Sequence, residues 1–391
     1  MKLKVLMLGL LVGAMGLVAC GGNNAGGSGE EKKGPWTVKF DSNGGNETYP
    51  DQIVEHKGLV TDPGTPTKSD EKGNYVFNGW RADGSLWSFK NSKVTKDTTL
   101  VASWLAKYAL SYQNADGTPN GTTTYVDSGT ALTAPATPTA PSGQRFYGWV
   151  NINNGGQVWR FDNESLNKVM ADTTLKPLFV SNNDAQVFEA ECCPDLLDEK
   201  WGPSGMPGAT YSGGSWGLGL VGCYENDAQG NNRLDASGSY DVGGKNYSAL
   251  IQFMYKKNDT LTFELNSSAA ATNVTLFMRI SAEYGTPDPE TDEVKNTFTD
   301  EEFQVTVNDT PVRYGEITLH NIVQSLIPCQ DYMLSATVSL NAGTNTIQMK
   351  VNNNKTVTSA IKAAAPCVDC IKLISSSTLT WPNETRTNVQ P

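Results

Sequence analysis

The chain has 391 residues, enough for two or three domains, and its formal net charge is −11 with a pI near 4.8. This acidic balance argues against nucleic acid and anionic surfaces as partners. The sequence contains only two histidines. It shows no nucleophile elbow, metal–histidine motif or phosphate loop, which argues against the common enzyme classes. The 38 glycines, the Thr and Asn runs and the closely spaced turn signals predict an all-β protein.

The first twenty residues have the pattern of an export signal. Lys2 and Lys4 precede an uncharged apolar run over residues 5–18, which is too short for a stable spanning helix. A small residue followed by Cys20 resembles the lipobox of bacterial lipoproteins, although a secretory signal with a chance Cys is the alternative. The resemblance implies that residues 1–20 are removed and that Cys20 carries lipid. The chain is then extracytoplasmic, held to a bacterial membrane by lipid alone, and expected at the cell surface.

Residues 21–35 predict a flexible linker. They are rich in Gly, Asn, Ser and Glu and have almost no apolar side chain to bury. A flexible coil of this length reaches only about 20 Å. The folded part is therefore expected close to the membrane unless something stiffer lifts it.

An internal repeat predicts two similar domains over residues 36–105 and 106–181. Phe-Asn-Gly-Trp at 77–80 recurs as Phe-Tyr-Gly-Trp at 146–149. Trp-Ser-Phe at 87–89 recurs as Trp-Arg-Phe at 159–161, and Asp-Thr-Thr-Leu at 97–100 recurs unchanged at 172–175. Each unit opens with an alternating stretch that predicts a strand, at 37–40 and 108–112. Self-similar units at this period indicate a tandem array.

These motifs resemble the internalin-type B repeat, also called the Listeria–Bacteroides repeat, of bacterial surface proteins. The resemblance implies a small β-grasp-like sheet per repeat and a stalk that lifts the C-terminal domain, with a protein partner for the repeats left open. Trp80, Trp87, Trp149 and Trp159 could form a ladder that stacks on sugars. We expect them in the core instead, because a unit of about 70 residues depends on its large aromatics for buried area.

Residues 182–376 predict a third domain, with residues 377–391 as a tail. Strands are expected at 248–254, 259–265, 274–280, 303–307, 336–340, 346–351 and 368–374. Before them, Glu189 and Glu191 alternate with Phe188 and Ala190, so the two acids share one face of a strand and the apolar residues share the other. Two carboxylates so close repel each other unless they accept a proton or bind a cation, and oxygen ligands in a β scaffold favour calcium. A polar edge that faces solvent is the alternative.

The Glu-Ala-Glu opening, the Gly-Thr-Asn-Thr-Ile at 343–347 and the closing Val-Asp-x-Ile resemble carbohydrate-binding modules of families 6 and 35. The resemblance implies a jelly-roll β-sandwich with a structural calcium ion held by Glu189, Glu191 and Asp369. It also implies a sugar site in loops at one end, built from an aromatic platform and an Asn. The candidates, each of which could instead serve packing, are Tyr211, Trp216, Tyr224, Asn352, Asn353 and Asn354.

All six remaining cysteines fall in this third domain: Cys192, Cys193, Cys223, Cys329, Cys367 and Cys370. An even count in an exported chain favours disulfides, although zinc or a redox pair is conceivable. If the first and last strands are neighbours, as the resemblance implies, a bond between Cys193 and Cys367 is expected.

Together these features predict a non-catalytic surface lipoprotein that presents a carbohydrate-binding module on a repeat stalk and binds a polysaccharide or glycan. A surface adhesin that binds host or neighbouring proteins is the alternative. A glycosidase that uses Glu189 and Glu191 is disfavoured, since two carboxyls on one strand face leave no room for a sugar between them.

Overall fold

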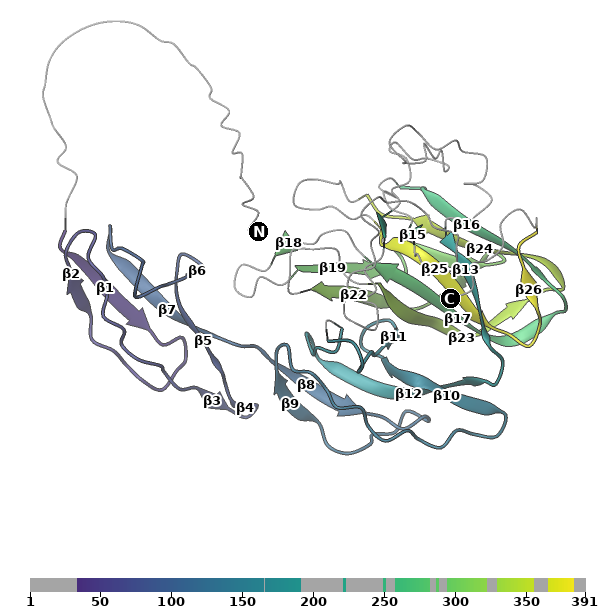
Figure 1. The fold of residues 1–391 in the computed structure, drawn as a ribbon, viewed down its shortest axis with the longest axis horizontal. Coiled ribbons are helices and arrows are strands. Elements are labelled where there is room, and N and C mark those ends of the chain that lie inside the picture. Colours follow the sequence, from purple (N-terminus) through teal and green to yellow (C-terminus); the bar gives the residue numbers. More distant parts are fainter. Residues whose placement is uncertain are drawn as a thin grey trace, which may run out of the picture.

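The computed structural model describes residues 34–164, 166–190, 221–222, 249–250, 257–281, 286–287, 294–321, 329–354 and 365–382. Every regular element within these ranges is a β-strand, which confirms the predicted all-β fold. Two small repeats lead into a larger sandwich, with repeat 1 at one end of the molecule and repeat 2 beneath the sandwich (Figure 1). In the same ranges no helix is long and apolar enough to cross a membrane.

Repeat 1 is a small mixed sheet with a β-grasp-like strand order. Its strands are β1 (Trp36–Asp41), β2 (Gln52–Val54), β3 (Ser69–Asp70), β4 (Gly73–Asn74), β5 (Phe77–Ala82), β6 (Ser85–Leu86) and β7 (Thr98–Trp104). The main sheet has the order β2-β1-β7-β5-β6, and β3 pairs with β4 beside it. The first and last strands, β1 and β7, are adjacent and parallel, and the other pairs are antiparallel.

Repeat 2 repeats this arrangement. Its strands are β8 (Lys107–Tyr112), β9 (Thr124–Asp127), β10 (Gln144–Asn151), β11 (Gln157–Val158) and β12 (Thr173–Ser181). They have the order β9-β8-β12-β10-β11, and β8 and β12 are again adjacent and parallel. The β-grasp-like fold expected for both repeats is confirmed.

The Phe-x-Gly-Trp motif marks a β-bulge in each repeat. The register shifts between Phe77 and Trp80 in β5, and again directly after Phe146 in β10. In a regular strand, residues three apart point to opposite faces, and one extra residue brings them to the same face. The Phe and Trp rings of each motif consequently pack edge to face, with centroids 5.8 Å apart in repeat 1 and 6.1 Å in repeat 2.

The Asp-Thr-Thr-Leu motif ties the last strand of each repeat to its first. Asp97 accepts a hydrogen bond from the backbone N–H of Thr37, and Asp172 accepts one from Ala109, both at 2.8 Å. The Leu of each motif is fully buried. Trp80, Trp149 and Trp159 are also buried in these cores and Trp87 is partly buried, so the core role expected of the tryptophans is confirmed.

The C-terminal domain is a β-sandwich. One sheet has the order β13-β25-β17-β23, and the other β21-β20-β24-β16-β26. Their strands are β13 (Ala185–Glu189), β16 (Thr260–Ser267), β17 (Ala271–Ser281), β20 (Phe303–Val307), β21 (Thr310–Val312), β23 (Gln330–Leu340), β24 (Gly343–Val351), β25 (Cys367–Ile374) and β26 (Leu379–Thr380). From β16 onward, successive strands of these two sheets largely alternate between them, as in a jelly roll. This is the sandwich that was predicted.

Two small sheets accompany the sandwich. β18 (Thr286–Pro287), β19 (Val294–Thr299) and β22 (Glu316–Asn321) form a three-stranded sheet in which β22 is an edge. β14 (Val221–Gly222) pairs with β15 (Ala249–Leu250). The three-stranded sheet shares the sandwich core, because Phe298 and Leu319 are buried in one cluster with Phe188, Phe263 and Ile347. Burial of each such side chain contributes about 1.5–3 kcal/mol.

Repeat 2 packs directly against the sandwich. β11 pairs with β23, Gln157 opposite Tyr332, so repeat 2 and the first sandwich sheet form one nine-stranded sheet. A separate apolar cluster fills the contact. It joins Val150, Val158, Leu178 and Val180 of repeat 2 to Phe277 and Ile374 of the sandwich. At its centre the Tyr147 ring stacks on Phe277, with centroids 4.7 Å apart.

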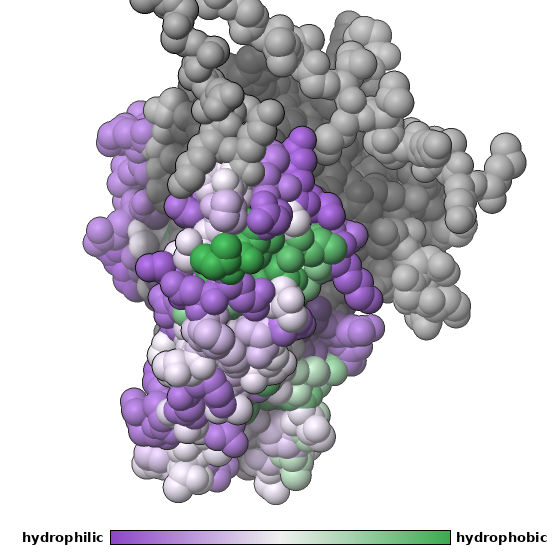
Figure 2. Space-filling view, turned by 90° about the vertical axis from the view of Figure 1, so that its left-hand side faces the viewer, coloured by the Kyte–Doolittle hydropathy of each residue, from purple (hydrophilic) through white to green (hydrophobic). Residues whose placement is uncertain are grey.

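The same face of repeat 1 has a different composition. Where repeat 2 has Tyr147, Val150 and Leu178, repeat 1 has Asn78, Arg81 and Ser103. Leu86, at the position of Val158, is 63% exposed. Seen from the repeat 1 end, the coloured surface is mostly hydrophilic, with a dark green apolar patch near its centre and a paler one at the lower right (Figure 2). Three of the apolar positions that the sandwich covers in repeat 2 are thus polar in repeat 1, and the fourth, Leu86, stays apolar and exposed.

Candidate functional site

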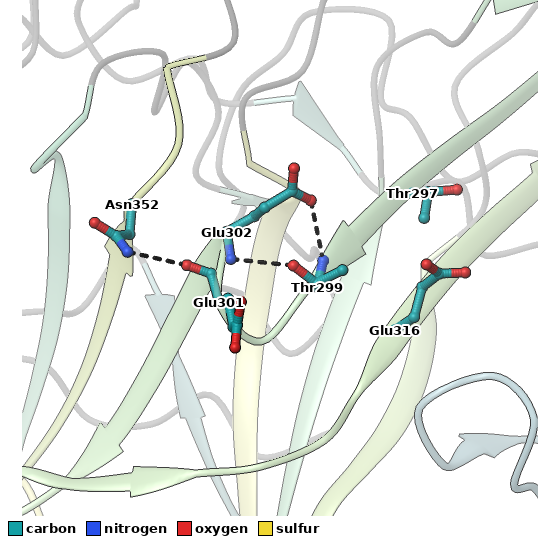
Figure 3. Close-up of a pocket in the computed structure, with 6 residues that line it drawn as sticks. All are labelled: Thr297, Thr299, Glu301, Glu302, Glu316 and Asn352. Carbon is teal, nitrogen blue, oxygen red and sulfur yellow. Dashed lines mark hydrogen bonds between the residues drawn. The ribbon is translucent and has the colours of Figure 1, made fainter.

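An open, polar pocket of about 630 Å³ lies between the three-stranded sheet and the end of β24. Thr297 and Thr299 come from β19, Glu316 from the start of β22, and Glu301 and Glu302 from the turn between β19 and β20; Asn352 follows β24. In Figure 3, Asn352 lies on one side of this turn, and Thr297 and Glu316 lie on the other. Three different segments of the fold thus supply the lining.

Hydrogen bonds fix the turn and Asn352 against each other. The Asn352 backbone N–H donates to the Glu302 carbonyl at 2.8 Å, and its side-chain Nδ2 donates to the Glu301 carbonyl at 3.1 Å. Glu302 and Thr299 cap each other. The Glu302 N–H donates to Thr299 Oγ1 at 3.2 Å, and the Thr299 N–H donates to Glu302 Oε2 at 3.3 Å (Figure 3). The polar lining is therefore held in a defined geometry before a ligand arrives.

The three predicted asparagines lie next to each other, but only Asn352 lines the pocket. Asn353 is buried, and its Nδ2 donates to the Glu302 carbonyl at 3.3 Å. Asn354 is exposed. Of the three, Asn352 is therefore the one placed to meet a ligand, while Asn353 supports the turn.

The pocket is acidic and rich in hydrogen-bonding groups. In the part of the chain that the structure describes, its lining holds three carboxylates, two hydroxyls and one amide, and no cationic side chain. Carboxylates accept hydrogen bonds from hydroxyls, and an amide both donates and accepts. Such a surface suits a neutral ligand with many hydroxyl groups and repels an anionic one.

Sequence reasoning did not find the two strands that form much of this pocket. β19 and β22 were absent from the predicted elements, and with them Thr297, Thr299 and Glu316. A signal was present in β22, where Ile317 and Leu319 alternate with polar residues and are both buried. In β19 the signal is weaker, because Phe298 is the one large apolar residue of its second half.

Asp369 is the one predicted calcium ligand whose side chain the structure describes. It is fully buried in β25 as the extra residue of a β-bulge, since Arg279 pairs with Cys370 and Ile280 with Val368. Its Oδ2 lies 3.3 Å from Arg279 Nε. Burial raises the pKa of Asp369 to about 6, against the opposing effect of Arg279 and Lys372.

One atom in this environment, Asp369 Oδ1, is suited to binding calcium. Within the described residues Asp369 Oδ1 is buried and receives no hydrogen bond, so an acceptor is available there. β13 runs beside β25 as the resemblance implied, with Glu189 opposite Cys370, but the Glu189 side chain and Glu191 lie outside the described residues. No group of three acidic, His or Cys side chains forms in the described ranges. Phe188 and Ala190 enter the core, as the alternation predicted.

The cysteine prediction is only partly within view. Cys367 and Cys370 are buried in β25, but Cys193 lies outside the described residues, so the bond expected between Cys193 and Cys367 stays a prediction. The Cys370 side chain lies within hydrogen-bonding reach of the Asp369 carboxylate. Cys329 is buried and disulfide-bonded. The remaining predicted site residues lie outside the described residues: Cys20, Cys192, Cys193, Tyr211, Trp216, Cys223 and Tyr224.

Comparison with known families identifies the repeats. Residues 36–103 and 108–176 match the sequence model of the Listeria-Bacteroides repeat domain. The chain contains two Listeria–Bacteroides repeats. A protein of Evansella cellulosilytica described as a Gly-rich membrane protein is 28% identical over 191 residues, which is 46% of this chain. The chain spans only 21% of that relative's length.

Solved structures similar to the C-terminal region are carbohydrate-binding modules of family 35. One, from Cellvibrio japonicus, is 13% identical and covers 51% of this chain and 99% of its own, with a TM-score of 0.23. Another, solved with a disaccharide that contains glucuronic acid, is 14% identical; the match covers 44% of this chain and 96% of that one, with a TM-score of 0.23. A Podospora anserina mannanase with such a module is 16% identical; the match covers 53% of this chain and 31% of that one, with a TM-score of 0.26. The β-sandwich itself is formed by the two sheets and the buried core described above.

Proposed function

We propose that the C-terminal sandwich binds a neutral polysaccharide or glycan, without catalysis, through the pocket lined by Asn352. One observation carries this proposal: Asn352, a sugar-binding candidate from the sequence, lines an open pocket whose other side chains are all hydroxyls and carboxylates. Hydroxyl-rich ligands match such groups, and a fixed arrangement lowers the entropy lost on binding. The three carboxylates disfavour uronic acids and sulfated sugars.

A glycan array of neutral and acidic polysaccharides, probed with the full chain, tests this proposal. Neutral glycans should bind, and Asn352→Ala should weaken binding about tenfold, since a lost hydrogen bond is worth about 1–1.5 kcal/mol. Asn354→Ala is the matched control, because Asn354 is exposed beside the pocket and does not line it. Equal losses in both variants, or binding of acidic glycans alone, would rule out this site.

A structural calcium ion at Glu189, Glu191 and Asp369 is proposed as part of the same module. The buried Asp369 Oδ1 with no hydrogen bond supports it, and Arg279 beside Oδ2 limits the negative charge. Oxygen ligands from these residues would hold the ion, and its binding would stabilise the folded state by mass action. Chelator should lower the melting temperature of the wild type and leave Glu191→Gln unchanged. A wild type that melts alike in calcium and in chelator would eliminate the ion.

Anchoring through lipid on Cys20 is proposed from the lipobox resemblance. The thiol is the acceptor, so Cys20→Ala should lose all label when cells are fed a palmitate analogue. Undiminished label in that variant would show that the chain is not a lipoprotein. The adhesin alternative predicts that the chain binds proteins and that it binds no glycan on the array described above.

A further inference from the structure

Repeat 2 meets the sandwich through a turn that repeat 1 lacks. Nine residues (150–158) separate Trp149 from Trp159, whereas six (81–86) separate the equivalent Trp80 from Trp87. The three additional residues lie in the connection between β10 and β11. We call residues 151–157 the docking turn. It lies against β22 and β23 of the sandwich.

Asn154 takes the place of a neighbouring strand for β22. Its Nδ2 donates to the Thr318 carbonyl at 2.8 Å, and its Oδ1 accepts from the Thr318 N–H at 2.7 Å. Within the described residues β22 is the edge of its sheet, and Asn154 supplies the hydrogen-bond partner of these two backbone groups. Asn154 itself is only 9% exposed. Its side chain is thus buried in a contact between residues 164 positions apart.

The two glycines that follow bring the backbones close together. Gly155 and Gly156 have φ of +51° and +73°. A Cβ on Gly155 would lie 2.3 Å from Ile317 Cγ1 and 3.1 Å from the Glu316 carbonyl oxygen, and one on Gly156 would lie 2.5 Å from the Met333 carbonyl oxygen. A side chain at either position would collide with the sandwich, so this close contact requires glycine at both positions.

The contact continues to the pocket. Thr318, held by Asn154, shares a hydrogen bond of 2.9 Å between its hydroxyl and that of Thr297, its partner across β19 and β22. Thr297 lines the pocket, and so does Glu316, whose carbonyl faces Gly155. One wall of the pocket therefore stands on the strand that the docking turn supports.

We propose that repeat 2 is a working part of the ligand-binding unit, in which the docking turn holds β22 and so positions Thr297 and Glu316. This rests on the function proposed above. Asn154 is then a positioning residue: it contacts no ligand, and it acts through Thr318. Of the two repeats, repeat 1 is then the one left as a spacer.

Hydrogen–deuterium exchange on the full chain tests this directly. Asn154→Ala should speed exchange of the β22 amides at least tenfold, because the Thr318 N–H loses its acceptor and the edge loses its cover, and should leave β16 and β24 unchanged. Asn153→Ala is the matched control, since Asn153 is exposed in the same turn. Asn154→Asp keeps an acceptor for the Thr318 N–H and should give an intermediate rate. Equal β22 exchange in Asn154→Ala and Asn153→Ala would overturn the proposal.

A binding measurement separates this proposal from the function it rests on. Xylohexaose, mannohexaose and cellohexaose serve as probes in titration calorimetry. If the wild type binds one of them, Asn154→Ala should weaken it at least threefold and Asn153→Ala should not; unchanged affinity despite faster exchange would overturn the positioning role. If the wild type binds none, the function fails for these neutral glycans, and the exchange result alone decides whether repeat 2 supports β22.

Discussion

Trp149 shows how one residue serves both the repeat and its neighbour. Its ring packs edge to face against Tyr112 and Phe146 in the core of repeat 2, at 5.9 and 6.1 Å. The next residue, Val150, points the other way into the contact with the sandwich. Trp80 has the same core position in repeat 1, but the residue after it is Arg81. The two equivalent tryptophans are thus followed by residues with different surroundings: Val150 contacts the sandwich, and Arg81 does not belong to that contact.

Replacing these tryptophans should destabilise different parts of the chain. Trp80→Ala should cost repeat 1 about 3–5 kcal/mol, because a large buried ring is lost and the cavity stays. Trp149→Ala should lower the stability of repeat 2 by a similar amount. Glycan binding should persist in Trp80→Ala. Calorimetry measures the stability and the array measures the binding; a stable Trp80→Ala that had lost glycan binding would instead favour a sugar-stacking ladder.

The element that matters most is the outer face of β10 and β12. Its apolar residues cover Phe277 and Ile374 of the sandwich, and burial of each contributes to the contact in proportion to its area. In the described part of the chain, the equivalent residues Asn78, Arg81 and Ser103 of repeat 1 are not part of an apolar cluster shared with the sandwich. The difference between two otherwise similar sheets is therefore a difference in what lies over them.

Exchanging these residues between the repeats should undo the contact. Tyr147→Asn with Val150→Arg introduces the repeat 1 residues into repeat 2, removes the ring stacked on Phe277 and places an unpaired guanidinium in an apolar cluster. We expect a loss of about 3 kcal/mol or more and faster cleavage by protease between the two domains. Asn78→Tyr in repeat 1 is the control and should change stability by less than about 0.5 kcal/mol. Equal protease resistance in the wild type and the double variant would contradict this.

Local patterns were sufficient for much of this architecture. Repeated motifs predicted both β-grasp-like sheets, and strict alternation predicted strands such as β16, β20 and β24. The docking of repeat 2 could not be predicted, because it depends on contacts such as that of Asn154 with Thr318, which no local pattern encodes. The pocket was missed for a related reason. Three of its six lining residues lie on β19 and β22, two lie in the turn after β19, and the sixth is Asn352, and these segments meet only in the folded chain.

At the scale of the whole molecule, the chain divides unequally. Among the described residues, the apolar cluster of repeat 1 is made of repeat 1 side chains, whereas another apolar cluster joins repeat 2 to the sandwich. Between the repeats the contacts are lighter, such as Lys107 Nζ 5.8 Å from the centre of the Tyr75 ring and Lys72 Nζ 5.8 Å from that of Tyr125. Repeat 1 is therefore one unit, and repeat 2 with the sandwich is another.

Thermal unfolding of the full chain should show this division as two transitions. The smaller should belong to repeat 1, which has little buried area of its own, and the larger to repeat 2 together with the sandwich. Trp80→Ala should move only the smaller transition, and Trp149→Ala only the larger. Three transitions, or a sandwich that melts at the same temperature in the Trp149→Ala variant, would show that repeat 2 unfolds alone.

The parallel pairing of the first and last strands also determines how a repeat responds to tension. In repeat 1 the chain enters at β1 and leaves at β7, and these strands lie side by side with Val38 to Asp41 opposite Thr98 to Val101. A pull on the two chain ends slides β1 along β7 and loads their hydrogen bonds together, where an antiparallel pair would open one bond at a time. The β8 and β12 pair of repeat 2 has the same geometry. Each repeat is thus arranged as a shear joint along the line of the chain.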